Sequence, residues 1–144
     1  MKTRRFTPPT LALLLLLLLM AGGIVLVVAL PNTALAWLRS EYRWLGQSVN
    51  WVEALNPSWD TVHILLFAVF GALAQLALPK VGPLKLLSWI AMFSAASELL
   101  QFWAPGRTAR LSDFAQDVLG ALVGVFFIWA LQAAWRRVHP KAKT

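Results

Sequence analysis

Seven residues with acid–base, hydrogen-bonding or ion-binding side chains are set within an otherwise apolar chain. They are Asp60, His63, Glu98, Gln101, Arg107, Asp113 and Asp117. Six of them form three pairs, which are Asp60 with His63, Glu98 with Gln101, and Asp113 with Asp117. The members of each pair are three or four residues apart, so they share one face of a helix. Carboxylates beside an imidazole can supply a general acid and base or ligands for a divalent cation. No motif specific to either chemistry is present, so we predict no metal ion or cofactor and assign no catalytic residue.

Composition narrows the classes of protein to which the chain can belong. Of its 144 residues, 59% are apolar and 13% charged, whereas soluble domains are about one quarter charged. One domain of this length cannot bury so much apolar surface in a soluble core, and disordered chains are far less hydrophobic. The absence of cysteine excludes a disulfide framework, a thiolate zinc site and a cysteine nucleophile. We predict an integral membrane protein with a single domain over residues 1–144.

Four apolar stretches have about the length that a helix needs to cross the hydrocarbon layer. They cover about residues 11–30, 61–78, 86–103 and 114–135. Helices are expected because a bilayer offers no water to unpaired backbone groups. The predicted fold class is all-α, a four-helix membrane bundle. The first stretch, followed by Ala34-Leu35-Ala36, also resembles a cleaved signal peptide, but it exceeds the usual apolar region of about 7–15 residues, so we expect an uncleaved span.

Lysine and arginine are distributed unevenly between the two ends of the predicted spans. Nine lie on the side of the N-terminus, namely Lys2, Arg4, Arg5, Lys80, Lys85, Arg136, Arg137, Lys141 and Lys143. Four lie on the other side, namely Arg39, Arg43, Arg107 and Arg110. The positive-inside rule then predicts that both termini are cytoplasmic. Membrane lipids are the expected partners, and nucleic acid is not expected, because the basic residues are scattered among short flanks.

The segment between the first two predicted spans has a regular apolar pattern. Trp37, Trp44 and Trp51 recur every seven residues, and each is followed by Leu38, Leu45 or Val52. On a helix these residues form one apolar stripe. We predict one amphipathic helix within Ala34–Trp59 that lies along the outer membrane surface. The alternative is a lid over a site.

The alternating direction of the spans brings polar residues from three helices to one side of the membrane. These residues lie at the start of the second span, the end of the third and the start of the fourth. One interpretation is a structural network in which the acids pair with arginines. The other is a binding or catalytic pocket open to the outer leaflet. We favour the pocket, because four carboxylates outnumber Arg107 and Arg110.

Small residues predict where helices approach closely. Gly120 and Gly124 form a Gly-x-x-x-Gly motif one turn beyond Asp117. We expect this motif to draw Asp117 towards the third span. Gly71, with alanines on either side, gives the second span a similar smooth patch.

Two segments resemble the VanZ-like family of small membrane proteins. The first is Glu98-Leu-Leu-Gln101-Phe-Trp-Ala-Pro105-Gly106-Arg107, followed by Asp113-x-x-x-Asp117-x-x-Gly120-Ala121-x-x-Gly124. The second is Asp60-Thr-Val-His63 with Phe67, which is similar to the family's Asp-x-x-His start of its second helix. One departure is Asp117, where the family pattern most often has asparagine.

The resemblance implies a multi-pass bacterial plasma-membrane protein connected with the cell envelope, in a family linked to low-level teicoplanin resistance. It implies no particular reaction, and whether the chain is an enzyme stays open. Our leading hypothesis is an outer-leaflet pocket that binds or acts on an envelope component. The ligand would be a lipid-linked precursor or an anionic head group, with Arg107 and Arg110 meeting its phosphate or carboxylate. Two alternatives are a non-catalytic accessory subunit of an envelope or polysaccharide-synthesis complex, and a hydrolase or transferase acting on a lipid phosphate.

Overall fold

The computed structural model describes residues 8–139, and the regular structure in that range is entirely helical. The helices are α1 (Pro8–Ala29), α2 (Asn32–Glu41), α3 (Arg43–Ala54), α4 (Thr61–Ala77), α5 (Pro83–Gln101) and α6 (Leu111–Val138). The predicted all-α class is confirmed for this range. The lysines and arginines at positions 2, 4, 5, 141 and 143, on which part of the orientation prediction rests, lie outside the described residues.

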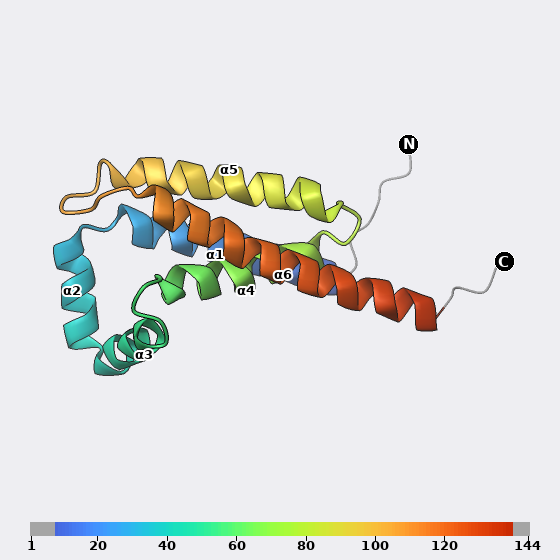
Figure 1. Ribbon diagram of the computed structural model, residues 1–144, viewed down its shortest axis with the longest axis horizontal. Helices are drawn as coiled ribbons and strands as arrows, with labels where there is room; N and C mark the ends of the chain where they lie inside the picture. Colours follow the sequence, from blue (N-terminus) through green and yellow to red (C-terminus); the bar gives the residue numbers. More distant parts are fainter. Residues whose placement is uncertain (1–7, 140–144) are drawn as a thin grey trace.

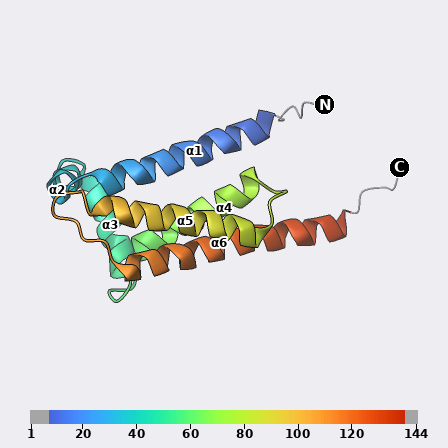
Figure 2. The same cartoon turned by 90° about the horizontal axis from the view of Figure 1, so that it is seen from above.

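Four helices run along the molecule, and two short ones lie across one end. Figure 1 shows α1, α4, α5 and α6 lengthwise, with α2 and α3 together at the end where α1 stops and α6 starts. Figure 2 shows α1 and α6 on opposite sides, with α4 and α5 between them. Because the long helices alternate in direction, the start of α4, the end of α5 and the start of α6 meet beside α2 and α3.

Two of the long helices, and a third that is shorter, have the composition of membrane-embedded elements. In the described range, Thr10–Ala29 and Leu111–Val138 are long and apolar enough to cross a membrane, and Thr61–Ala77 is a shorter apolar helix. Large side chains on α1 point outward, with Leu18 67% and Leu19 73% exposed. An apolar surface of this extent is not typical of a monomeric soluble protein. Two to three apolar helices therefore support the prediction of a membrane protein.

A core of large side chains connects the four long helices. Its buried members are Ile24 and Val28 of α1, Phe67, Phe70 and Ala74 of α4, Leu86 and Ile90 of α5, and Ala121 and Val125 of α6. The rings of Phe67 and Phe70 lie edge to face, with centroids 6.1 Å apart, an arrangement favoured by aromatic quadrupoles. This core fixes the positions of α4, α5 and α6 just below the polar residues.

Helices α4 and α6 approach each other at glycine. A Cβ atom added to Gly120 would overlap the carbonyl oxygen of Ile64, and one added to Gly124 would overlap that of Ala68. A Cβ on Gly71 would lie 2.7 Å from the carbonyl oxygen of Ala121. The glycine pair packs against α4 and not against the third span. Asp117 nevertheless reaches the third span, as expected, because it accepts a hydrogen bond from Ser94 of α5. Gly120 and Gly124 of α6, together with Gly71 of α4, leave room for the two helix backbones to come into contact.

The single amphipathic helix predicted within Ala34–Trp59 was also wrong, because the chain breaks at Tyr42. Tyr42 has φ −99° and ψ 78°, outside the helical region, and α3 turns back beside α2. Gly46 permits the turn, since a Cβ there would lie 2.7 Å from the carbonyl oxygen of Arg39. An ion pair of 3.3 Å between Arg39 and Glu53 joins the two helices.

The break at Tyr42 also divides the predicted apolar stripe between two surfaces. Trp37, Trp44 and Trp51 are 58%, 69% and 67% exposed. Leu38 and Leu45, the residues that follow the first two tryptophans, instead line a cavity inside the molecule. The helix pair α2–α3 therefore presents indole rings outward and leucines inward.

Candidate polar and apolar cavity

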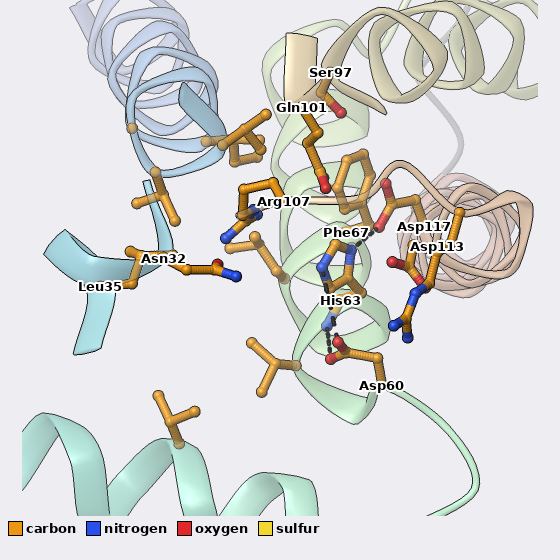
Figure 3. Close-up of a pocket in the computed structure, with 18 of the residues that line it drawn as sticks. Asn32, Leu35, Asp60, His63, Phe67, Ser97, Gln101, Arg107, Asp113 and Asp117 are labelled. Carbon is orange, nitrogen blue, oxygen red and sulfur yellow. Dashed lines mark hydrogen bonds and ion pairs between the residues drawn. The ribbon is translucent and has the colours of Figure 1, made fainter. Parts of the chain in front are cut away.

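A cavity of about 700 Å³ lies at the end of the bundle where α2 and α3 are found. One side of it contains six of the seven residues singled out above, namely Asp60, His63, Gln101, Arg107, Asp113 and Asp117. The other side is mostly apolar, with Met20, Ile24, Val27 and Val28 from α1 and Leu35, Leu38, Leu45 and Val49 from α2 and α3. The ion-paired Arg39 and Glu53 also line it. Figure 3 shows His63 and Asp117 facing the cavity across from Asn32 and Leu35 of α2.

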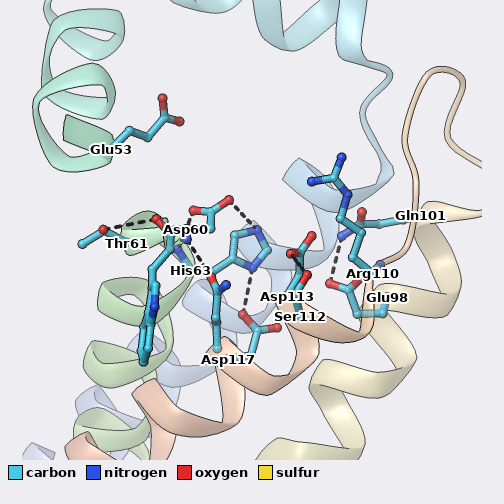
Figure 4. A network of polar contacts seen from close by, with 12 residues as sticks. Glu53, Asp60, Thr61, His63, Glu98, Gln101, Arg110, Ser112, Asp113 and Asp117 are labelled. Atoms are coloured by element: carbon cyan, nitrogen blue, oxygen red, sulfur yellow. Dashed lines mark hydrogen bonds and ion pairs between the residues drawn. The ribbon is translucent and has the colours of Figure 1, made fainter. Parts of the chain in front are cut away.

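His63 on α4 is bound by Asp117 on α6. The Nδ1 atom of His63 lies 2.8 Å from Oδ1 of Asp117. The second carboxylate oxygen, Oδ2, accepts a hydrogen bond of 2.7 Å from the hydroxyl of Ser94 on α5. Asp117 is 0% exposed. One buried carboxylate therefore connects three helices and fixes the imidazole ring in orientation. Figure 4 shows its contact with His63.

Asp60 holds His63 from the other side. It caps α4, because its Oδ1 accepts a hydrogen bond of 3.3 Å from the backbone N–H of His63. Its Oδ2 lies 3.9 Å from Nε2 of the same imidazole. Its backbone N–H donates to Oε1 of Gln116 at 2.8 Å, which attaches this end of α4 to α6. Each ring nitrogen of His63 therefore faces a carboxylate.

Glu98, the seventh predicted residue, lies behind the cavity wall. Its Oε1 accepts a hydrogen bond of 3.1 Å from the side chain of Gln101, and its Oε2 accepts one of 3.2 Å from the backbone N–H of Arg110. Glu98 is 7% exposed and does not line the cavity. It nevertheless belongs to the same cluster, because one ligand atom from each of His63, Glu98 and Asp117 lies within 4.8 Å of the others.

The two arginines of the α5–α6 loop line the cavity without pairing to an acid. Within residues 8–139, the ion pairs are those of Arg39 with Glu53 and of His63 with Asp60 and Asp117. The interpretation in which the acids pair with Arg107 and Arg110 is therefore wrong for this range. Asp113, which also lines the cavity, accepts a hydrogen bond of 3.0 Å from the adjacent Ser112.

The loop that carries Arg107 is attached to α2. Gly106 has φ 77°, a left-handed conformation that favours glycine. Its carbonyl oxygen accepts a hydrogen bond from the side-chain amide of Asn32, and the carbonyl of Pro105 accepts one of 3.3 Å from the backbone N–H of Asn32. In Figure 3, Arg107 lies between Asn32 and His63.

Sequence reasoning missed the serines of α5 and the asparagine of α2. Ser94 binds Asp117, and the hydroxyl of Ser97 donates to the carbonyl oxygen of Ser94 at 2.8 Å. Both serines share one helix face with Glu98 and Gln101, and that spacing is the signal that could have found them. Asn32 gave no such signal, because its partner Gly106 is 74 residues away.

The arrangement supports three kinds of chemistry. An imidazole oriented by a buried carboxylate can take or give a proton at its other nitrogen. The same imidazole with two carboxylates can bind a divalent cation. A guanidinium group without an acidic partner can bind phosphate or carboxylate through two parallel hydrogen bonds.

Comparison with known proteins gives one match. A family model described as VanZ/LLP1 matches residues 10–132, which is most of the chain and includes every residue of the cavity discussed above. No curated protein and no solved structure matches the chain significantly.

Proposed function

This chain belongs to the VanZ/LLP1 family, and we propose that it is a bacterial plasma-membrane protein whose cavity binds an envelope molecule with an anionic head and a long apolar tail. Lipid-linked envelope precursors and anionic phospholipids share this chemistry. The observation that carries the proposal is a cavity in which an apolar wall adjoins an arginine without an ion-pair partner among residues 8–139.

The proposed placement in the membrane has four spans, with the cavity at the outer end. Lys80, Lys85, Arg136 and Arg137 lie near the ends of the long helices that are remote from the cavity. The positive-inside rule assigns that end, and with it both termini, to the cytoplasm. The exposed tryptophans of α2 and α3 would then lie at the level of the outer head groups, where indole rings are favoured.

The apolar wall supports the tail of such a ligand. Residues of α1 form one part of it, and inward-facing leucines of α2 and α3 form the other. The cavity volume of about 700 Å³ lies within the range of ligand pockets. It can therefore take the head and the first part of a tail, while the remainder of the tail stays in the membrane.

The polar side supports an anionic head group. Arg107 enters the cavity from the α5–α6 loop, beside the oriented imidazole of His63. Arg107 is half-buried and forms no ion pair within residues 8–139, so an anion that binds there would meet a guanidinium whose charge is not already paired. We propose binding and leave a covalent reaction unassigned.

Replacing Arg107 tests the proposal directly. We expect Arg107→Gln to weaken binding of a polyprenyl phosphate by about 10- to 100-fold, because a charge-assisted hydrogen bond contributes roughly 1.5–3 kcal/mol. The measurement is a tryptophan-fluorescence titration of the purified protein in detergent. The matched control is Arg43→Gln, which removes an arginine from the same end of the molecule but from outside the cavity.

The neutral polyprenol of equal length separates head-group binding from tail binding. We expect both variants and the wild type to bind it equally weakly. Equal affinity of wild type and Arg107→Gln for the phosphate would contradict the proposal and favour the accessory-subunit alternative. In cells, the proposal extends to glycopeptide resistance: at equal protein level, Arg107→Gln should remove whatever teicoplanin protection the wild type gives.

A further inference from the structure

We propose that His63, Glu98 and Asp117 bind one divalent cation of the Zn²⁺ or Mn²⁺ class. The three residues come from α4, α5 and α6 and offer one ligand atom each within 4.8 Å of the others. A point midway between three atoms that are at most 4.8 Å apart lies no more than about 2.8 Å from each of them. Zinc binds nitrogen and oxygen ligands at roughly 2.0–2.2 Å. Shifts of well under 1 Å at each side chain would complete the coordination, a small movement for side chains around an ion.

The charge around the cluster independently favours a cation. Four of the six acidic residues of the chain meet here, namely Asp60, Glu98, Asp113 and Asp117. Two of them, Glu98 and Asp117, are buried, and within residues 8–139 no lysine or arginine forms an ion pair with either. Buried carboxylates are strongly unfavourable unless they are paired or coordinate a metal. One imidazole cannot balance two of them, whereas a divalent ion can.

The ligand types select the class of ion. An imidazole nitrogen with two carboxylates suits zinc, manganese and other first-row ions, whereas calcium and magnesium favour sites built only of oxygen. The 2.8 Å between Nδ1 of His63 and Oδ1 of Asp117 is close to the separation of about 3 Å that adjacent ligands have around such an ion. An ion bound by both atoms would take the place of the proton that this hydrogen bond now holds between them.

Neighbouring groups are placed to orient the proposed ligands. Ser94 donates to Asp117, and Gln101 donates to Glu98. If Nδ1 of His63 binds the ion, its Nε2–H faces Asp60, with the oxygen 3.9 Å away. Partners of this kind fix the orientation of metal ligands and raise affinity.

The proposed site keeps room for a further ligand. Three protein ligands leave at least one coordination position open, as in catalytic zinc sites. Since His63 and Asp117 both line the cavity, the open position faces it. The cation site goes beyond the lipid-binding proposal and does not depend on it, because it rests only on the three side chains and their surroundings.

Metal titration of the purified protein in detergent tests the site. After treatment with chelator, we expect the wild type to take up about one equivalent of Zn²⁺ or Mn²⁺ by calorimetry, and bound Mn²⁺ to show an immobilised spectrum by electron paramagnetic resonance. We expect His63→Gln and Glu98→Gln each to lower affinity at least 100-fold. His139→Ala, at the other end of the molecule, should change it less than tenfold.

Several results would overturn the proposal. They are absence of stoichiometric uptake by folded wild-type protein, unchanged affinity in both glutamine variants, and loss of uptake in His139→Ala. The wild-type stoichiometry decides the matter even if a variant fails to fold. Polyprenyl phosphate binding is measured separately on metal-free protein, so failure of one proposal leaves the other distinguishable.

Discussion

Gly124→Ala is expected to prevent stable assembly of the bundle. The added methyl group would overlap the carbonyl oxygen of Ala68 and lie 2.8 Å from the backbone nitrogen of Ala72. These are backbone atoms of α4, so no side chain can turn away, and α4 and α6 must separate. Overpacking of this kind destabilises by roughly 1–3 kcal/mol and by more where backbone must move. Thermal unfolding of the purified protein in detergent, followed by size-exclusion chromatography, measures the loss.

The matched control for this substitution is Gly22→Ala on α1. A Cβ at Gly22 meets no atom within 4 Å, and alanine favours helix over glycine by up to about 1 kcal/mol in water. This variant should unfold at the wild-type temperature or slightly above. Equal stability of Gly124→Ala and Gly22→Ala would show that the close contact between α4 and α6 is absent.

Asp117→Leu is expected to be nearly as damaging, whereas Asp117→Asn should fold. Leucine leaves the buried hydroxyl of Ser94 without its acceptor and the half-buried imidazole of His63 without its partner, and a buried unsatisfied group destabilises by about 1–3 kcal/mol. Asparagine keeps an oxygen to accept from one neighbour and an amide to donate to the other. The same unfolding assay should rank the wild type first, then Asp117→Asn, then Asp117→Leu by a wide margin.

The asparagine variant also separates the structural role of Asp117 from its charge. It keeps the connection among α4, α5 and α6 but removes one negative charge from the cluster. We expect it to fold and yet to bind Zn²⁺ or Mn²⁺ at least 100-fold more weakly than the wild type. Equal stability of the leucine and asparagine variants would contradict the hydrogen-bonding role.

The features of the chain that were predictable are those carried by long patterns. The apolar stretches predicted the four long helices to within a few residues, and their alternation accounts for why Asp60, Glu98 and Asp117 lie at one end. Spacing within the helices placed the polar residues in pairs on shared faces, and six of the seven residues singled out line the cavity. The length of an apolar stretch, the direction of a helix and the helical periodicity depend on residues that are close together in the sequence, so they can be read from it.

The features that were missed depend on contacts between distant segments. The glycines of α6 leave one face of the helix without side chains, and the sequence shows this. Which helix packs on that face depends on how α4, α5 and α6 are arranged around the core. The turn at Tyr42 depends on the close approach of Gly46 to Arg39. The tryptophans repeat every seven residues across this turn, so the pattern indicated one continuous helix. The sequence also did not show that Glu98 would accept a hydrogen bond from the backbone N–H of Arg110, whose guanidinium forms no ion pair within residues 8–139.

The two hydrogen bonds from Asn32 to the α5–α6 loop have a mechanical consequence. They join the start of α2 to the residues just before Arg107, so a displacement of α2 and α3 would be passed to the loop that carries this arginine. A lipid or protein that contacts the exposed tryptophans of α2 and α3 would therefore be expected to alter the position of Arg107 as well.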